Sequence, residues 1–491
     1  MLVDFIYLIG SACFYFVPIN FDGNRNYYIL TGWILLYLLL NLYGAYKRNK
    51  INFFISPIFL SVIFTFLLQL GVLSNLLIYL IAGKTTYLQY TEILATETGW
   101  LPKVMYVTSW ACFFYWKGYN SKIAYNFYNW LKRIPIYRRL LNSELSAQKI
   151  FVLAIFSYLL KAYLYSIGLF GRVLSEKYFV AGEGYKGIYY LRELGNISYV
   201  TFFLISILKF SSNTKTNRFM FYLSLVMELF FGFIYGARST FIYPILLLLL
   251  ANYYVKGKVN KLLLVTVLPF TLIASMTIVL AYKNFTVSQD FVKSKSIFEI
   301  YKTYKEYQKY AGESAIGESA ILDASEMLIT NTTFVQESAV LFRFTEKDPR
   351  SPKMRSKVLK NIALIPIDAV IPKFIQGDNN FPWGLWFKDE VVYHNIGLNY
   401  SLAFSPIGFL YMGGGIFLVV LFFWLYGLAL KLAYCFMQEK SRLYLLVYFL
   451  LLVSVYNLDS IVSGVFINLI RVLLIFPFIF WILFGKARII K

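Results

Sequence analysis

The chain has 491 residues, of which 59% are hydrophobic, 20% aromatic and only 15% charged. Soluble globular domains carry about 25% charged residues, so this composition excludes an ordinary soluble protein. The net charge of +22 would favour a nucleic-acid partner in a soluble chain. In a membrane protein its meaning depends on where the basic residues lie.

Apolar runs of roughly 17–25 residues recur along the chain and predict membrane-spanning helices. The runs predict twelve spans, at residues 3–19, 27–45, 51–72, 102–117, 150–171, 196–210, 219–236, 239–254, 262–282, 403–430, 443–457 and 464–484. The start of the chain shows no basic n-region and no small-residue cleavage site, so we expect the first span to be retained. The predicted fold class is an all-α polytopic membrane protein.

The spans divide the chain into three consecutive parts. Residues 1–282 are expected to hold spans one to nine, residues 283–398 a large polar loop, and residues 399–491 spans ten to twelve. With both termini inside, the inside segments hold 22 basic residues against two acidic ones, and the short outside loops hold eight basic residues. Cytoplasmic loops collect Lys and Arg. The pattern therefore places both termini in the cytoplasm and the polar loop outside, and it argues against nucleic acid.

The polar loop carries 15 basic and 14 acidic residues and the only histidine, His394. Its sequence predicts an amphipathic helix over 291–310, another helix over 311–326, and an interfacial or re-entrant piece over 361–374. We expect these short helices to form a lid over an outward-facing cavity.

Two residues are candidates for a general base. Imidazole titrates near neutral pH, so His394 can accept a proton from a hydroxyl group, although an ordinary hydrogen-bonding role is the alternative. Asp459 follows the eleventh span at its outer end and is the second candidate.

Arg238 lies in a tight turn, 236–239, at the outer junction of spans seven and eight. The turn would hold the guanidinium in place, and its planar fork suits bidentate contact with phosphate. A helix-end arginine that reaches the headgroups is the alternative. Other outer basic residues could join it around a diphosphate, or be solvated charges: Arg172, Arg192, Arg343 and Lys373.

Three charged residues fall inside predicted spans. At a rise of 1.5 Å per residue, Glu228 and Arg471 both lie roughly 10–12 Å below the outer boundary. A charge there costs about 2.5–3.5 kcal/mol on insertion scales unless it is paired or faces water. We expect these two to pair across the bundle or to line one aqueous cavity. Lys161 lies deeper and is expected to snorkel or to face the cavity.

Other motifs carry no chemistry. Cys13, Cys112 and Cys435 lie in or beside spans, so neither a disulfide framework nor a metal site is predicted. Residues 182–187 match the dinucleotide fingerprint formally, but they follow a membrane helix and lack a βαβ context. We expect no cofactor.

Three stretches resemble the bacterial O-antigen and capsule polymerases and, more distantly, the O-antigen ligases. The GARST turn at 236–240 resembles their G-S-R motif, and IPIDAVIPKF at 365–374 resembles a run near the end of their large periplasmic loop. The stretch that begins at His394 resembles the end of that loop and the helix after it. Phe409 stands where the family usually has a glutamate.

The resemblance implies a membrane-embedded glycosyltransferase with a GT-C-like fold in the bacterial inner membrane. It would join undecaprenyl-diphosphate-linked oligosaccharide repeat units at the periplasmic face. The expected partners are the lipid-linked glycans, the bilayer, a chain-length regulator and a flippase. The family's diphosphate-binding arginine corresponds to Arg238, and His394 follows the ligase-like pattern.

Two rival functions stay open. A ligase that moves finished glycan to a lipid A core would use the same chemistry with a different acceptor. A flippase or transporter of lipid-linked glycan predicts buried charges along a central path and no need for a large outer loop.

Overall fold

A computed structural model of the protein describes part of the chain. The described residues are 2–16, 24–70, 72, 98–135, 146–166, 195–235, 238–267, 335–370, 383–391, 406–439, 441–456 and 462–484. Every regular element within these ranges is a helix. This confirms the all-helical prediction for the part of the chain that the structure describes.

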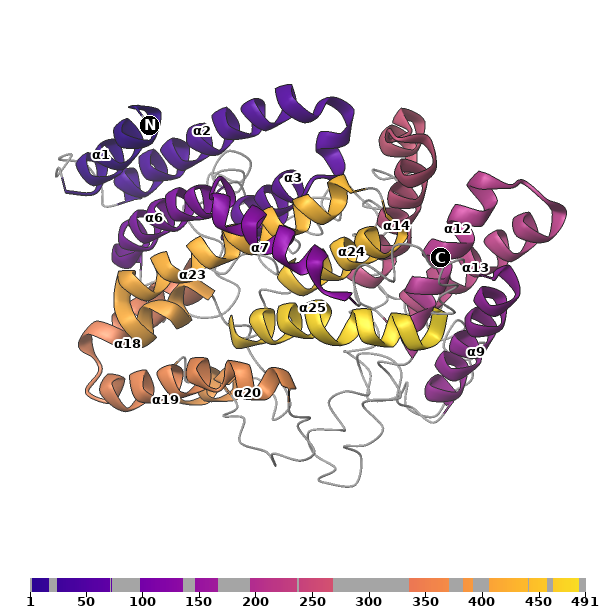
Figure 1. Ribbon diagram of the computed structural model, residues 1–491. Coiled ribbons are helices and arrows are strands. Elements are labelled where there is room, and N and C mark those ends of the chain that lie inside the picture. The colour runs from indigo at the N-terminus through magenta and orange to yellow at the C-terminus, as the bar shows by residue number, and fades with distance from the viewer. Residues whose placement is uncertain are drawn as a thin grey trace, which may run out of the picture. The chain divides into compact units, whose positions relative to one another are not determined.

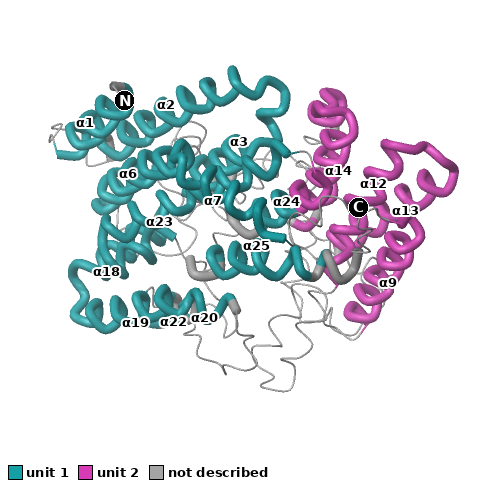
Figure 2. Tube along the Cα trace, viewed as in Figure 1, with its two compact units in different colours: residues 1–142, 329–439, 447–483 teal, residues 143–328, 440–446, 484–491 magenta. Residues whose placement is uncertain are grey.

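The chain forms two compact units, which Figure 2 shows in different colours. Unit 1 consists of residues 1–142, 329–439 and 447–483, and unit 2 of residues 143–328, 440–446 and 484–491. Unit 1 therefore joins the first helices of the chain to the end of the polar loop and to the helices that follow it.

Unit 1 contains most of the described α-helices. They are α1 (Leu2–Phe16), α2 (Asn24–Asn49), α3 (Pro57–Ser61), α6 (Leu101–Tyr119), α7 (Lys122–Arg133), α18 (Val335–Lys347), α19 (Ser351–Ala363), α20 (Ile365–Val370), α22 (Trp383–Trp386), α23 (Pro406–Gln438) and α25 (Val462–Phe484). The described helices of unit 2 are α9 (Ala147–Ser166), α12 (Ile197–Ser211), α13 (Lys215–Tyr235) and α14 (Arg238–Lys256). Helix α24 (Arg442–Tyr456) has residues in both units, and the last residue of α25, Phe484, belongs to unit 2.

Membrane character is visible in three of the described helices. The segments Asn26–Ile55, Ala147–Ser166 and Pro406–Gln438 are long and apolar enough to cross a bilayer. Several shorter apolar helices also coincide with predicted spans, among them α1, α12, α14, α24 and α25. The number of twelve spans stays a prediction.

The third predicted span, 51–72, is not one continuous α-helix. It consists of a 3-10 helix (Lys50–Ile55), α3 and a π-helix (Val62–Gln69). Pro57 begins α3, and the Ser56 side chain caps it by accepting a hydrogen bond from the Phe59 N–H. Proline is favoured at this position because the first helical N–H has no partner within the helix. The chain therefore restarts its helix here.

Helices α6 and α23 cross at backbone contact, and this crossing forms the centre of unit 1 (Figure 1). A Cβ on Gly118 of α6 would lie 2.1 Å from the Trp424 carbonyl oxygen. A Cβ on Gly427 of α23 would lie 2.1 Å from the Tyr115 carbonyl oxygen. Small residues allow such close approach between membrane helices, where packing drives association.

The loop helices α18 and α19 pack on the first part of α23 (Figure 1). Gly408 meets α18, because a Cβ there would lie 2.6 Å from Leu341 Cδ1. Gly413 meets α19 in the same way, with Val358 Cγ1 at 2.6 Å. Two glycines thus let α18 and α19 lie directly on the helix that follows the loop.

Helix α23 is broken just after this contact. Gly414 and Gly415 have non-helical backbone angles, and Gly415 has φ of 62°. Such a positive φ is readily adopted only by glycine. The Nε of Arg355 on α19 donates a hydrogen bond to the Gly413 carbonyl at 3.2 Å, which satisfies an acceptor that the break would otherwise release. Helix α19 therefore stabilises the break in α23.

Alanine at Gly427 should destabilise unit 1 by about 1–3 kcal/mol or more, because backbone atoms cannot rotate away from the new Cβ. Thermal unfolding of the detergent-solubilised protein measures the effect. Gly32→Ala in α2 is the matched control, since a Cβ there meets no atom within 4 Å. It should be neutral or stabilising by about 0.5–1 kcal/mol. Equal behaviour of the two variants would contradict the crossing.

Candidate functional site

Several predicted site residues lie outside the described residues: His394, Asp459, Arg172, Arg192 and Lys373. The predicted helices over 291–310 and 311–326 also lie outside them. The other predicted site residues can be placed at least in part.

Arg238 is the first residue of α14, and α13 ends at Tyr235. Only its backbone is described. The Thr240 hydroxyl donates a hydrogen bond to the Gly232 carbonyl at 3.2 Å, so the start of α14 is tied to the end of α13. The Arg238 backbone is thus placed at a helix N-terminus, where the partial positive charge of the helix favours anions.

Glu228 pairs with Lys161, a partner that the sequence analysis did not name. Its Oε2 lies 3.1 Å from the ammonium of Lys161, and both side chains are only 1% exposed. The ammonium also lies 4.7 Å from the centre of the Tyr199 ring. Oε1 of Glu228 accepts no hydrogen bond from the described residues. The pair joins α9 to α13 inside unit 2, where α12 packs against both helices.

Arg471 holds a loop helix in place. From α25 it donates hydrogen bonds to the carbonyl of Asp368 at 2.9 Å and to that of Ala369 at 3.3 Å. These are carbonyls of the last turn of α20, which a cation near a helix C-terminus stabilises. Glu228 belongs to unit 2 and Arg471 to unit 1, and the predicted pairing of these two residues stays a prediction.

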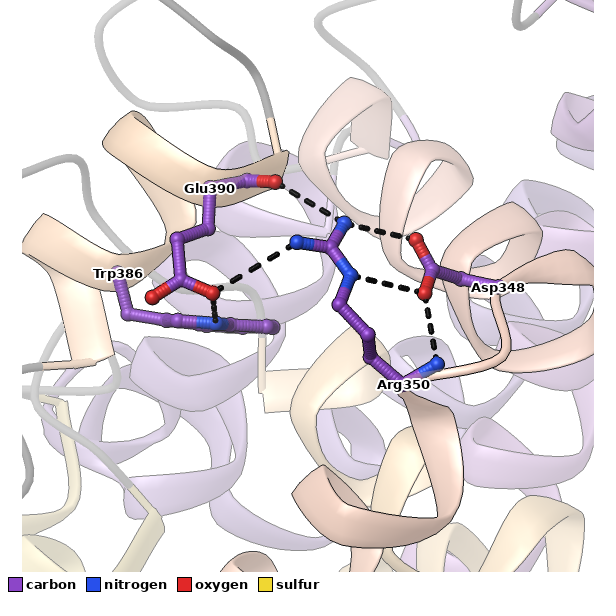
Figure 3. A network of polar contacts seen from close by, with 4 residues as sticks. All are labelled: Asp348, Arg350, Trp386 and Glu390. Atoms are coloured by element: carbon purple, nitrogen blue, oxygen red, sulfur yellow. Dashed lines mark hydrogen bonds and ion pairs between the residues drawn. The ribbon is translucent and has the colours of Figure 1, made fainter.

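Arg350 forms the centre of a polar network at the junction of α18 and α19 (Figure 3). Its Nε and Nη2 donate to the two carboxylate oxygens of Asp348, at 3.0 and 2.8 Å. Nη2 also donates to the Glu390 carbonyl at 3.2 Å, and Nη1 lies 3.7 Å from the Glu390 carboxylate. Trp386 donates from its indole N–H to the same carboxylate at 3.1 Å.

This network attaches the π-helix Phe387–Val391 to the lid. Hydrogen bonds from Arg350 hold the pKa of Asp348 below its usual value, and the charge of Arg343 on α18 acts in the same direction. Asp348 is therefore ionised and paired at neutral pH. Val391, the last described residue of this segment, lies three residues before His394 in the sequence.

A second charged contact joins α6, α18 and α23. Glu346 pairs with Lys103 and accepts a hydrogen bond from the Tyr411 hydroxyl at 2.6 Å. Burial acts to raise the pKa of Glu346, but the hydrogen bonds from Lys103 and Tyr411 outweigh it and hold this pKa below its usual value. The Tyr411 ring stacks on Phe342 with centres 3.8 Å apart.

An open pocket with a volume of about 660 Å³ lies beside these contacts, at the α18–α19 junction and the break in α23. Lys347 and Arg355 are its cationic lining residues. Its acidic lining residues, Glu346 and Asp348, already have basic partners. The pocket therefore offers two cations, a tyrosine and several hydrogen-bonding groups, which suits a polar or anionic ligand.

Glu337 is a carboxylate of the lid that the sequence analysis did not single out. It lies in the first turn of α18, and its Oε2 is buried with no hydrogen-bond partner among the described residues. Burial raises the pKa of Glu337 to about 7. A carboxyl group that titrates near neutral pH can exchange a proton under physiological conditions.

The contacts of the lid could be anticipated only in part. The stretch Asp348-Pro349-Arg350-Ser351-Pro352 carries the turn signals that separate two helices, and Asp348 accepts a hydrogen bond from the Arg350 N–H at 2.8 Å. No local pattern signals that Arg350 contacts Glu390, because 40 residues separate the two.

Comparison of the chain with protein-family models, with curated proteins and with solved structures finds no match.

Lys161→Met should destabilise the protein by about 3–5 kcal/mol, because it leaves the buried Glu228 carboxylate without its partner. Lys161→Met combined with Glu228→Leu should recover most of that loss, since an apolar pair of similar volume needs no charge compensation. Chemical unfolding in mixed micelles measures both variants. A double variant no more stable than the single one would contradict the ion pair.

Glu337 should make the lid less stable as pH rises. Its folded pKa of about 7 lies above the ordinary value of 4.5. The contribution of Glu337 to the free energy of unfolding is therefore fully present below about pH 4.5 and is lost as pH rises toward 7. Relative to wild type, Glu337→Gln should gain stability over this range in thermal unfolding at several pH values.

Glu346→Gln is the matched control for this experiment. The folded pKa of Glu346 is lowered, so the wild-type carboxylate stabilises at neutral pH and that stabilisation is lost as pH falls. The loss of stability in Glu346→Gln relative to wild type should therefore become smaller at acidic pH. The same trend in both variants would contradict the burial of Glu337.

Proposed function

We propose that the protein is a multi-span membrane glycosyltransferase that joins lipid-linked oligosaccharide repeat units at the periplasmic face of the bacterial inner membrane. The proposal includes twelve spans, a GT-C-like fold, both termini in the cytoplasm and an outer lid. The sequence motifs around Arg238 and after the polar loop suggest this chemistry. The helical membrane character and the docked lid are consistent with it.

The observation that carries the proposal is the Arg350 network. It ties the segment that ends three residues before His394 to the lid helices (Figure 3). A general base must be held in place to within a fraction of an ångström. A network with five charged or polar contacts around Arg350 and Glu390 is a support of the kind that such a base requires.

In the proposed reaction, a sugar hydroxyl of one lipid-linked unit attacks the anomeric carbon of the glycan on a second carrier. The new glycosidic C–O bond forms as the bond from the anomeric carbon to the diphosphate oxygen breaks. Undecaprenyl diphosphate leaves with that electron pair. His394 takes the hydroxyl proton, with Asp459 as the second candidate.

The leaving diphosphate gains negative charge in the transition state, so cations held in advance lower the barrier. Arg238 is the main candidate, and its position at the N-terminus of α14 adds helix amide groups that favour an anion. Arg172, Arg192, Arg343 and Lys373 are the proposed supporting cations.

His394→Ala and Arg238→Ala should each abolish long-chain surface polysaccharide without loss of the protein from the membrane. Arg238→Lys should recover activity only in part, because a point charge lacks the bidentate fork. Gel analysis of the polysaccharide, with an immunoblot of the membrane fraction, measures the outcome.

Arg218→Ala is the matched control, since Arg218 is an exposed arginine near the other end of α13 and should be dispensable. Long chains in the His394 variant would refute the base assignment. The glycan that remains on the lipid A core distinguishes a polymerase from a ligase. A lost polymerase leaves cores with a single repeat unit, whereas a lost ligase leaves cores without any.

A further inference from the structure

Helix α19 has an uneven distribution of charge. It contains Lys353, Arg355, Lys357 and Lys360 and no acidic residue. The three lysines recur at i, i+4 and i+7, so they lie along one face of the helix. Lys353 and Lys360 are exposed. Like charges at this spacing repel one another, and no acidic residue within α19 offsets that repulsion.

The opposite side of α19 packs against the rest of unit 1. Ser351, Met354 and Val358 are buried, and Val358 packs against Gly413 of α23. Arg355 donates a hydrogen bond to the Gly413 carbonyl. The docking of α19 on α23 therefore fixes its orientation and leaves the lysine face on the outside of unit 1.

Helix α20 continues from α19 toward an apolar groove. Only Leu364 separates the two helices, and hydrogen bonds from Leu364 N–H to Lys360 O and from Asp368 N–H to Leu364 O bridge the junction. Buried Ile365 and Ala369 pack against Ile467 of α25. The lysine face and the groove therefore lie along one stretch of chain, with Lys360 roughly 14 Å from Ala369 along the helices.

The groove itself faces outward. It has a volume of about 210 Å³ and is lined by Ala369 together with Ile470, Leu474, Ile475 and Phe478 of α25. Leu474 is 59% exposed and Phe478 is 49% exposed. In a helix of a membrane protein, such exposed apolar side chains contact lipid chains.

We propose that α19, α20 and α25 form a binding site for anionic phospholipid of the outer leaflet. The headgroup phosphates contact the lysine face of α19, and an acyl chain occupies the groove beside α20. Lysines spread over roughly 10 Å of helix act as separate point charges. They suit several singly charged headgroups, whereas tight recognition of one diphosphate favours the converging forks of arginines.

This site differs from the proposed catalytic site and does not depend on it; only the choice of the outer leaflet rests on the proposed topology. Its occupant anchors the lid helices at the membrane surface, in the way that basic amphipathic helices bind anionic lipids. Arg471 contributes by holding the end of α20 against α25, since its hydrogen bonds go to α20 carbonyls.

The test is lipid retention by the purified full-length protein, measured by native mass spectrometry while phosphatidylglycerol is titrated in a phosphatidylcholine background. The wild type should retain phosphatidylglycerol selectively. Lys353→Gln combined with Lys360→Gln should weaken this retention about fivefold per lysine. Leu474→Trp should displace the acyl chain by filling the groove, without a change of charge.

Two control variants make the test specific. Lys215→Gln with Lys261→Gln removes two other exposed lysines, and Val226→Trp enlarges an exposed apolar residue of α13 that does not line the groove. Both should retain phosphatidylglycerol as the wild type does. An equal loss in the controls, unchanged retention in the site variants, or binding of polyprenyl diphosphate in place of phosphatidylglycerol would overturn the proposal.

Discussion

The backbone contact between α6 and α23 is the constraint on which the rest of unit 1 depends. Gly118 and Gly427 bring the two helices so close that a single added Cβ would lie 2.1 Å from a carbonyl oxygen. In a bilayer, where lipid chains are as apolar as leucine, close packing replaces the hydrophobic effect as the force between helices. The position of α23 follows from this contact.

Because α23 is held there, its first part serves as a platform for the polar loop. Helices α18 and α19 pack on Gly408 and Gly413. The break at Gly414 and Gly415 comes immediately after these contacts in the sequence. The short polar stretch between the two lid helices then carries the Arg350 network, which reaches the segment before His394. A constraint between two helices is thus transmitted, contact by contact, to the region where we propose catalysis.

Sequence analysis predicted the helices well because the hydrophobic period and the length of each apolar run are local properties. The described α1, α12, α24 and α25 begin and end close to the predicted spans. The same information did not reveal the break in α23. The glycines there were visible, but glycine is also common in unbroken membrane helices, where it allows close packing.

The partners of charged residues were harder to predict. Hydropathy gives the depth of Glu228 in its helix but not which helices are its neighbours, so the pair with Lys161 on α9 was not predicted. Likewise, the charge-dense run after Arg343 showed no sign of which residues pair, because Arg350 and Glu390 are brought together by the fold. The stretch around Arg238 was singled out from local turn residues alone, and its functional role stays a prediction.

The most direct test of the central claim is elongation by the purified protein in liposomes supplied only with an undecaprenyl-diphosphate-linked repeat unit. The account predicts a ladder of products, each longer by one repeat unit and each still carried on undecaprenyl diphosphate. A correctly folded wild-type protein that yields no product longer than the single repeat unit would contradict it.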